Sequence, residues 1–174
     1  MLQVSSREVY RNRWLTLRED VTRLPDGSPG LYTVVEKPTA ACVIPFEDDG
    51  FHLVEQYRYP LGRRSWEFVQ GTWPADGPPG EELARAELAE ETGLRASGLT
   101  LLGRLAIAPG LTTQECDVFL ATGLTAGAPD REETEQGMEQ RWFSRAEFEA
   151  MIRDGILFDN TTLAAYTMFL LATS

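Results

Sequence analysis

The sequence predicts an α/β fold: an α/β/α sandwich in which helices cover both faces of a mixed β-sheet, with a small antiparallel β piece at the N-terminus. Three observations support this prediction. A chain of 174 residues that is 43% hydrophobic can bury one good core and a small appended subdomain. After residue 40, short apolar runs typical of strands are interspersed with helical runs. Before residue 40, only short extended segments occur.

The N-terminal piece is expected to contain two extended segments, residues 14–18 and 31–35. The turn signal Pro25-Asp26-Gly27 lies between them, and such clusters connect antiparallel strands. We therefore predict that residues 1–38 form an N-terminal strand extension and residues 39–174 form the main domain.

The main domain is expected to contain both strands and helices. Runs of apolar and aromatic residues predict six strands, at residues 41–46, 51–57, 66–69, 101–106, 117–122 and 139–143. Helical spacing predicts three helices, at residues 79–92, 144–153 and 161–171. This mixture favours a mixed sheet with helices on both faces.

Charge and hydropathy exclude several classes of partner. A net charge of −11 repels the phosphate backbone of nucleic acids and anionic membrane surfaces. The opening residues MLQVSSREVY lack an apolar signal-peptide core. The longest apolar stretch, near Leu163 to Thr173, is shorter than the roughly 18 residues of a membrane span. We expect a cytoplasmic protein with no nucleic-acid or membrane partner.

Scarce residue types narrow the chemistry further. Cys42 and Cys116 lie far apart without metal-ligand spacing, which indicates buried thiols. His52 is the only histidine, so a Ser-His-Asp triad would depend on it, and its strand-like surroundings favour a structural role. Lys37 is the only lysine, and no GxxxxGK[ST] motif occurs, which excludes a P-loop. Any chemistry must therefore use carboxylates and arginines, with or without a metal.

One predicted helix carries a row of glutamates. At about 100° per residue, Glu87, Glu90 and Glu91 fall on one face, and Gly93 is placed to end the helix. Like charges one turn apart repel, so this face needs either full solvation or a cation. Carboxylate oxygens suit magnesium or manganese. An ordinary solvated acidic helix is the alternative.

Gly71 and the segment Glu87-Leu88-Ala89-Glu90-Glu91-Thr92-Gly93-Leu94 resemble the signature of Nudix hydrolases. That signature is a glycine, five residues, a glutamate, seven residues, and then Arg-Glu-apolar-any-Glu-Glu-any-Gly-apolar. The final part matches at every specified position except the first. Ala86 stands at the arginine position, Pro78 stands at the first glutamate position, and one extra residue lies between Gly71 and the helix.

The resemblance implies a Nudix-type fold and a metal site. Glu87 and Glu91 would coordinate Mg²⁺, or Mn²⁺ in its place, and Glu90 would assist through a second ion or a water. The backbone carbonyl of Gln70 would add a ligand. In the family, the missing arginine and glutamate mainly support the metal-binding acids, so their loss is expected to lower metal affinity or rate without abolishing either.

Four other segments resemble the ADP-ribose pyrophosphatase branch of the family, namely Val54–Pro60, Trp66–Phe68, Ala108–Gly110 and Phe158–Asn160. A proline about sixteen residues after the last glycine of the signature, Gly93 in this chain, marks this branch, and Pro109 stands at that position. The resemblance therefore covers nearly the whole chain.

This branch implies substrate-binding roles for residues outside the glutamate row. Arg58 would hold a phosphate through two parallel hydrogen bonds, with an ordinary surface arginine as the alternative. Glu67 would contact the substrate. Trp14 would stack on an adenine base, or else would pack in the core or at a dimer interface.

Two loops complete the predicted site. Pro109 and Gly110 would place backbone near the terminal ribose, with Glu115 as a nearby carboxylate, although a simple tight turn is the alternative. The acidic stretch 131–137 would supply the glutamate that deprotonates water or adds a metal ligand. Glu133 and Glu135 are the candidates, and a solvated loop is the alternative.

The resulting hypothesis is Mg²⁺-dependent hydrolysis of a nucleoside diphosphate linked to another moiety. ADP-ribose or a related nucleotide sugar is the expected substrate, giving a nucleoside monophosphate and a sugar phosphate. The alternatives are a different nucleotide sugar such as GDP-mannose and a nucleotide-binding protein with little or no activity. The resemblance also implies a homodimer formed through the N-terminal strands.

Overall fold

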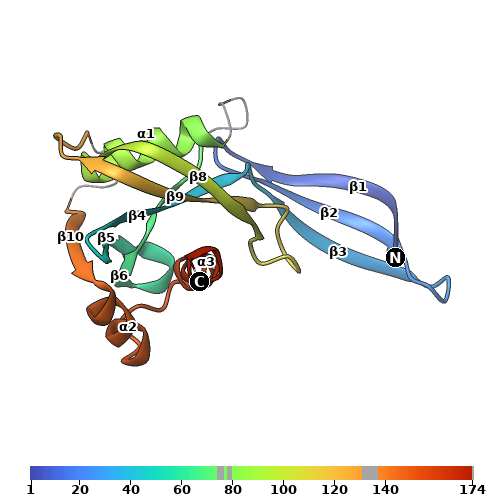
Figure 1. Cartoon of the computed structure of the whole chain (residues 1–174). Helices are drawn as coiled ribbons and strands as arrows, with labels where there is room; N and C mark the ends of the chain where they lie inside the picture. Colours follow the sequence, from blue (N-terminus) through green and yellow to red (C-terminus); the bar gives the residue numbers. More distant parts are fainter. Residues whose placement is uncertain (74–76, 78–79, 131–136, 174) are drawn as a thin grey trace.

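The computed structural model describes residues 1–73, 77, 80–130 and 137–173. The main domain is built on a seven-stranded mixed sheet, and helix α1 covers one face while α2 and α3 cover the other (Figure 1). Its strands are β4 (Ala40–Glu47), β5 (Gly50–Arg58), β6 (Arg63–Glu67), β7 (Val69–Gly71), β8 (Arg95–Ala106), β9 (Glu115–Thr125) and β10 (Glu139–Ser144). Its helices are the 3₁₀ turn η1 (Tyr59–Leu61), α1 (Glu81–Thr92), α2 (Arg145–Arg153) and α3 (Asn160–Thr173). The predicted α/β/α sandwich is confirmed.

Strand β4 is the centre of the sheet. It pairs with β9 in parallel and with β5 and β7 antiparallel. Ala41 and Val43 pack in the apolar cluster that contains α1 residues, whereas Cys42 and Ile44 pack in the cluster that contains α3 residues. Because both faces of the strand are buried, β4 reads as a continuous apolar run rather than as an alternating one.

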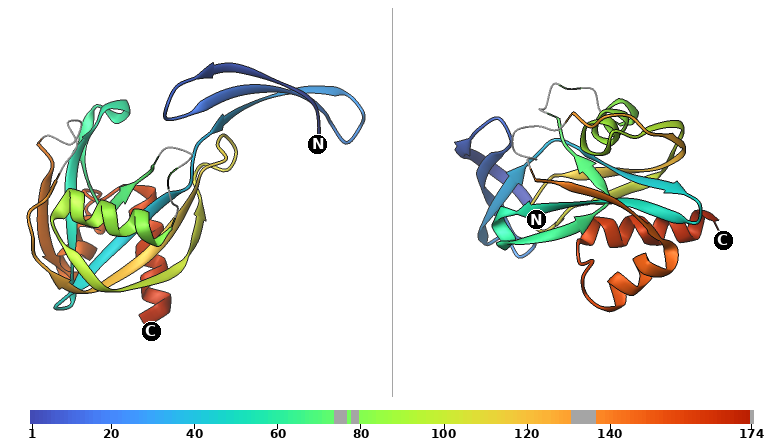
Figure 2. Two further views of the ribbon diagram at one scale, coloured as in Figure 1. Left: turned by 90° about the horizontal axis from the view of Figure 1, so that it is seen from above. Right: turned by 90° about the vertical axis from the view of Figure 1, so that its left-hand side faces the viewer.

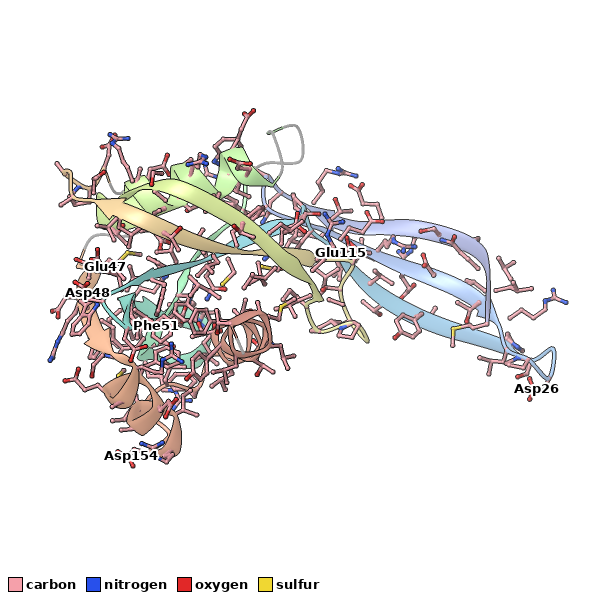
Figure 3. All side chains as sticks on the ribbon, viewed as in Figure 1. Asp26, Glu47, Asp48, Phe51, Glu115 and Asp154 are labelled. Carbon is pink, nitrogen blue, oxygen red and sulfur yellow. The ribbon has the colours of Figure 1, made fainter. Side chains whose placement is uncertain are left out.

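The larger apolar cluster lies between the sheet and helices α2 and α3. Phe51 is fully buried there and meets the rings of Phe148 and Phe169 at centroid distances of 4.9 and 5.2 Å (Figure 3). Such ring pairs add to the free energy that apolar burial already supplies. The two cysteines are also buried and free, as predicted.

Helix α1 forms the other layer and carries the glutamate row. Its buried Leu83, Ala84 and Leu88 pack against the sheet. Gly93 ends the helix in the left-handed conformation, with its N–H donating to the carbonyl of Ala89 at 2.9 Å, so the predicted helix end is confirmed. The helix begins at Glu81, two residues later than predicted.

The predicted single strand over residues 66–69 is in fact two strands. Strand β6 pairs with β5 and β7 pairs with β4, and Phe68 lies between them. The N–H of Phe68 donates to the side-chain oxygen of Thr162 in α3 at 3.0 Å, so it leaves the strand ladder at this point. The chain thereby crosses from one strand partner to another inside a short segment.

The N-terminal residues form a separate three-stranded antiparallel sheet, here called the arm, made of β1 (Leu2–Arg11), β2 (Thr16–Arg23) and β3 (Pro29–Glu36). Figure 2 shows the arm projecting away from the main domain. The turn at Pro25-Asp26-Gly27 is confirmed, and Figure 3 places Asp26 at the far tip of the arm.

Strand β1 was not predicted. Every residue in it is exposed, so it lacks the alternation of buried and exposed side chains that marks a strand in a sequence. It forms by backbone pairing with β2. The predicted segment 14–18 also began too early, because Trp14 and Leu15 lie in a turn where their N–H groups donate to the side-chain oxygen of Asn12.

Candidate functional site

Two of the three predicted glutamates lie buried under the sheet-facing side of α1. Glu87 is 7% exposed and Glu91 is 1% exposed, while Glu90 is half-buried. A Cβ atom on Gly71 would collide with the carboxylate of Glu87, so this glycine permits the close approach of α1 to β7. Full solvation, the alternative explanation for an acidic helix, therefore does not describe Glu87 and Glu91.

Beside these glutamates, Arg58 and Glu67 form an ion pair within the β5–β6 hairpin, in which Glu67 is buried and Arg58 is partly exposed. The Nε of Arg58 donates to both carboxylate oxygens of Glu67 at 3.0 Å, and its Nη2 donates to one of them. Glu67 is only 1% exposed. Burial opposes the positive charge of Arg58, but the hydrogen bond and the charge of Glu67 raise the pKa of Arg58 above its ordinary value.

Gln70 links this ion pair to helix α3. Its side-chain amide donates to Glu67 at 2.9 Å and to Asp159 at 3.1 Å. Asp159 also accepts from the N–H of Thr162 at 2.8 Å, which caps the first turn of α3. Two carboxylates that would otherwise face each other therefore share one neutral donor.

Several carboxylates lie close to the buried thiol of Cys42, on the inner side of the site. Burial raises the pKa of the Cys42 thiol well above its ordinary value, and the nearby Cys116, Asp159, Glu91 and Glu67 raise it further. Buried carboxylates that repel one another favour a bound cation.

A cleft of about 360 Å³ opens between the arm and the main domain. Its lining includes Arg13, Trp14, Lys37, Arg58, Gln70 and Gly71. A second hollow of about 340 Å³ adjoins it on the arm side and shares Arg13, Trp14, Lys37 and Pro38 with it. The two hollows together run from the arm to the strand that faces Glu87.

The structure brings several predicted substrate residues to this cleft. Arg58 and Gln70 line it from the main domain, and Trp14 lines it from the arm. Trp14 is 42% exposed and lies under the guanidinium of Arg13, 4.4 Å from the ring centroid. Trp14 is therefore not a core residue. Glu67 does not line this cleft; it contacts Arg58 and lines a separate pocket of about 460 Å³ together with Arg58 and Gln70.

Other predicted residues lie outside the lining of the cleft. The carbonyl of Gly110 accepts from the Tyr32 hydroxyl at 2.7 Å, which ties the loop around Pro109 to the arm. Glu115 forms an ion pair with Arg104 at 2.9 Å and lies near the base of the arm (Figure 3). Their predicted substrate contacts stay predictions.

Glu133, Glu135 and Pro78 lie outside the described residues. The described residues on either side of the acidic stretch are anchored near the site. The N–H of Asp130 donates to the carbonyl of Glu90 at 3.0 Å, and Arg64 donates to the carbonyl of Gly137 at 2.9 Å.

The cleft also contains residues that were not predicted to take part. Gln114 donates to the carbonyl of Pro38 at 3.2 Å and to the hydroxyl of Thr72 at 3.3 Å, which ties three chain segments together. Lys37 lines both hollows. The isolation of one lysine among fifteen arginines was the only sequence signal for Lys37, and Gln114 had none.

The residues present fit a hard divalent cation. Glu87, Glu91 and the carbonyl of Gln70 are all oxygen donors on the two facing elements α1 and β7. In the part of the chain that the structure describes, no three His, Cys, Asp or Glu side chains converge closely enough to hold a metal by themselves. Additional oxygens must complete the shell, as magnesium usually requires of water and phosphate.

The fold and the site define the class of protein. A NUDIX domain profile matches residues 36–164, and a profile described as the nucleoside diphosphate sugar hydrolase N-terminal domain matches residues 2–35. The chain belongs to the Nudix family and is a Nudix hydrolase. Members of this family generally use divalent metals.

Its relatives include ADP-ribose pyrophosphatases. The chain is 34% identical to that of Mycobacterium tuberculosis over 163 residues, 92% of this chain and 79% of the relative. It is 30% identical to that of Bacillus subtilis over 130 residues, 74% of this chain and 70% of the relative. A methanol dehydrogenase activator of Bacillus methanolicus is 28% identical over 123 residues, 70% of this chain and 66% of the relative. The resemblance to the ADP-ribose pyrophosphatase branch is confirmed.

A solved structure supports the fold. The crystal structure of an ADP compounds hydrolase matches with a TM-score of 0.83 at 22% identity, covering 98% of this chain and 91% of the other. None of the helices in the described ranges has the length and apolar character that crossing a membrane requires.

Proposed function

We propose that the protein hydrolyses ADP-ribose or a related nucleotide sugar in a Mg²⁺-dependent reaction, giving a nucleoside monophosphate and a sugar phosphate. The observation that carries this proposal is the charge distribution of the cleft. Arg13, Lys37 and Arg58 line it, although the chain as a whole carries a charge of −11. Glu87 lies against Gly71 at one side of the same cleft. The arginine and lysine side chains would bind the phosphates of a diphosphate, and the adjacent carboxylates would bind the metal ion that bridges to it.

Glu87, Glu91 and the Gln70 carbonyl would hold the metal, with Glu90 assisting. Mg²⁺ is the expected ion, and Mn²⁺ would be accepted by the same oxygens. When bound, the ion would neutralise charge that develops on the diphosphate. Ala86 at the arginine position leaves these acids less firmly oriented, which is expected to weaken metal affinity.

Arg58 would hold the phosphate farther from the nucleoside. Glu67 fixes the Nε edge of the guanidinium, and among the described residues no hydrogen bond is made by Nη1. A guanidinium held in one orientation loses little entropy when it binds an anion. Glu67 thus acts on the substrate mainly through Arg58.

The reaction itself is phosphoryl transfer to water. The water oxygen forms a bond to phosphorus, the bridging P–O bond of the diphosphate breaks, and a carboxylate accepts the water proton. Glu133 or Glu135 is the proposed base. Little covalent chemistry is asked of the protein, so positioning and electrostatics supply most of the rate enhancement.

The nucleoside would bind toward the arm. Trp14 offers an exposed aromatic surface at the cleft, which suits stacking on a purine. Pro109, Gly110 and Glu115 would contact the terminal ribose, with the loop of Pro109 and Gly110 anchored through Tyr32.

A second copy of the chain is the proposed partner of the arm. Strand β1 has no buried residue and exposes Leu2, Val4, Val9 and Tyr10. A three-stranded sheet needs a covered face for independent stability. Pairing of two arms in a homodimer would provide that cover. Two buried, free cysteines are consistent with a reducing compartment such as the cytoplasm.

The deciding experiment incubates the protein with ADP-ribose and Mg²⁺ and scores AMP and ribose 5-phosphate. We expect both products in equal amounts and their loss when a chelator removes the metal. A parallel panel includes GDP-mannose, and turnover of that compound alone would reassign the substrate.

The departures at Ala86 and Pro78 support one rival function, a nucleotide-binding protein without hydrolysis. Ligand affinity measured with and without Mg²⁺, alongside turnover, separates the two. Tight Mg²⁺-dependent binding with no products would establish the silent binder.

A further inference from the structure

Lys37 occupies a fixed position at the junction of the arm and the main domain. It lies between strands β3 and β4, and its N–H donates to the hydroxyl of Thr113 at 3.3 Å. Two residues earlier, Val35 exchanges backbone hydrogen bonds with the loop before β9, at 2.9 Å to Leu111 and 3.0 Å from Thr113. The backbone of Lys37 is therefore held in place at the mouth of the cleft.

The backbone of Lys37 is hydrogen-bonded, whereas its side chain has no polar partner among the described residues. It is half-buried and lines both hollows. Within the described ranges it forms no ion pair and donates no side-chain hydrogen bond. Two other cations of this region have acidic partners, since Arg18 pairs with Glu36 and Arg58 pairs with Glu67, whereas Arg13 lies over the ring of Trp14.

The surroundings of Lys37 disfavour an isolated positive charge. Burial lowers the pKa of its ammonium group, and the nearby Arg58 lowers it further. An anion bound in the cleft would relieve both effects, because it supplies an opposite charge to Lys37, whereas the neighbouring Glu36 is paired with Arg18.

The residues that line the two hollows indicate which part of the substrate would supply this anion. Trp14, the proposed base-stacking residue, lines both hollows, and the hollow on the arm side lacks Arg58 and Gly71. The main cleft contains Arg58 and Gly71, which mark the proposed metal and the far phosphate. Lys37 lines both hollows together with Trp14, and it is near enough to Arg58 for the two charges to repel, so it lies between the base and the reacting end of a bound substrate.

We propose that Lys37 binds the phosphate that remains attached to the nucleoside, and that it thereby holds the nucleoside monophosphate half of the substrate. This proposal rests on the proposed function for the orientation of the substrate. A lysine suits this task because its ammonium is a compact point charge on a flexible stem, whereas Arg58 provides a rigid fork for the far phosphate.

The test uses the full-length protein and three variants. Lys37→Met removes the charge and keeps the length of the side chain. Lys37→Arg restores a cation. Arg95→Met is the matched control, because Arg95 is exposed on β8, lines neither hollow, and forms no ion pair within the described residues. It changes the net charge by the same amount.

The affinities of AMP and adenosine are measured for each protein, and GMP with guanosine serves as a second pair. For Lys37→Met we expect AMP to bind about tenfold more weakly, about 1.4 kcal/mol. Adenosine affinity should be unchanged, and Lys37→Arg should recover most of the loss. Unchanged AMP affinity in Lys37→Met, or an equal loss for adenosine, would overturn the proposal.

Steady-state kinetics with ADP-ribose separate binding from catalysis. A contact made equally in the ground state and the transition state raises KM and leaves kcat within about threefold of the parent protein. A large fall in kcat with unchanged KM would contradict the assignment. If the parent protein binds AMP but turns over no nucleotide sugar, the proposed function fails while the AMP and adenosine comparison still decides the role of Lys37. If it binds AMP no better than adenosine, the Lys37 proposal fails.

Discussion

The arm and the main domain are both built on β-sheets, but they differ in how far the strands are buried. In the main domain, the central strand β4 is covered on both faces, and the aromatic cluster around Phe51 supplies apolar burial. In the arm, backbone pairing joins three strands, of which β1 is exposed throughout and β2 buries only the polar residues Thr16, Asp20 and Thr22. The cleft lies where they meet, so its proposed metal-binding side belongs to the main domain and its proposed base-binding side belongs to the arm. The comparison predicts that stability and substrate binding can be perturbed separately.

The largest expected effect is on stability. Phe51→Ala removes a fully buried ring from the main cluster, so the free energy of unfolding should fall by about 3–5 kcal/mol. Val9→Ala on the exposed arm is the control and should change it by less than about 0.5 kcal/mol. Denaturant unfolding of both variants checks the contrast. Equal losses would show that the arm is as tightly packed as the main domain.

The next effect is on the chemical step. Glu91→Gln should lower kcat by about 100-fold, about 2.7 kcal/mol, because an amide is a poor ligand for a hard cation. Folding should be intact, as judged by thermal unfolding. Glu82→Gln, on the exposed side of the same helix, is the matched control and should keep the parent activity. Near-normal turnover of Glu91→Gln would remove Glu91 from the mechanism.

The acidic stretch offers a test that requires two separate variants. Replacing Glu133 or Glu135 with glutamine should slow ADP-ribose hydrolysis by more than about tenfold for whichever residue is the base, about 1.4 kcal/mol. Stability should not change. If both variants retain more than a tenth of the parent rate, the base lies elsewhere.

The smallest expected effect concerns the arm itself. Trp14→Ala should raise KM for ADP-ribose about fivefold, about 1 kcal/mol, through the loss of base stacking. The midpoint of unfolding should shift little, because Trp14 is exposed and outside both apolar clusters. Trp14→Phe should recover most of the affinity. A large loss of stability with unchanged KM would instead assign Trp14 a purely structural role.

Much of the main domain could be predicted because its signals are local. The spacing of Glu87 and Glu91 places them one turn apart on any helix, and Gly93 marks where that helix ends. The apolar run at residues 41–46 indicated the strand that became β4. These features depend on residues close in sequence, so they are readable before folding.

Long-range contacts decided the rest. No local pattern announces β1, since its strand depends on pairing with β2. The break at Phe68 depends on Thr162 in a distant helix. Gln70 was considered for its carbonyl alone, and only the approach of Asp159 across 89 positions gave its side chain a second carboxylate to bridge.

The sequence by itself determined the class of site: a row of carboxylates on a helix after a glycine, with Arg58 as the candidate phosphate-binding cation. The tertiary structure decided how those groups are used. It buried Glu87 and Glu91, paired Arg58 with Glu67, and left Lys37 at the junction of two hollows. The physical reason is that residue spacing defines the face of a helix, whereas burial and charge pairing depend on elements that meet only when the sheet has assembled.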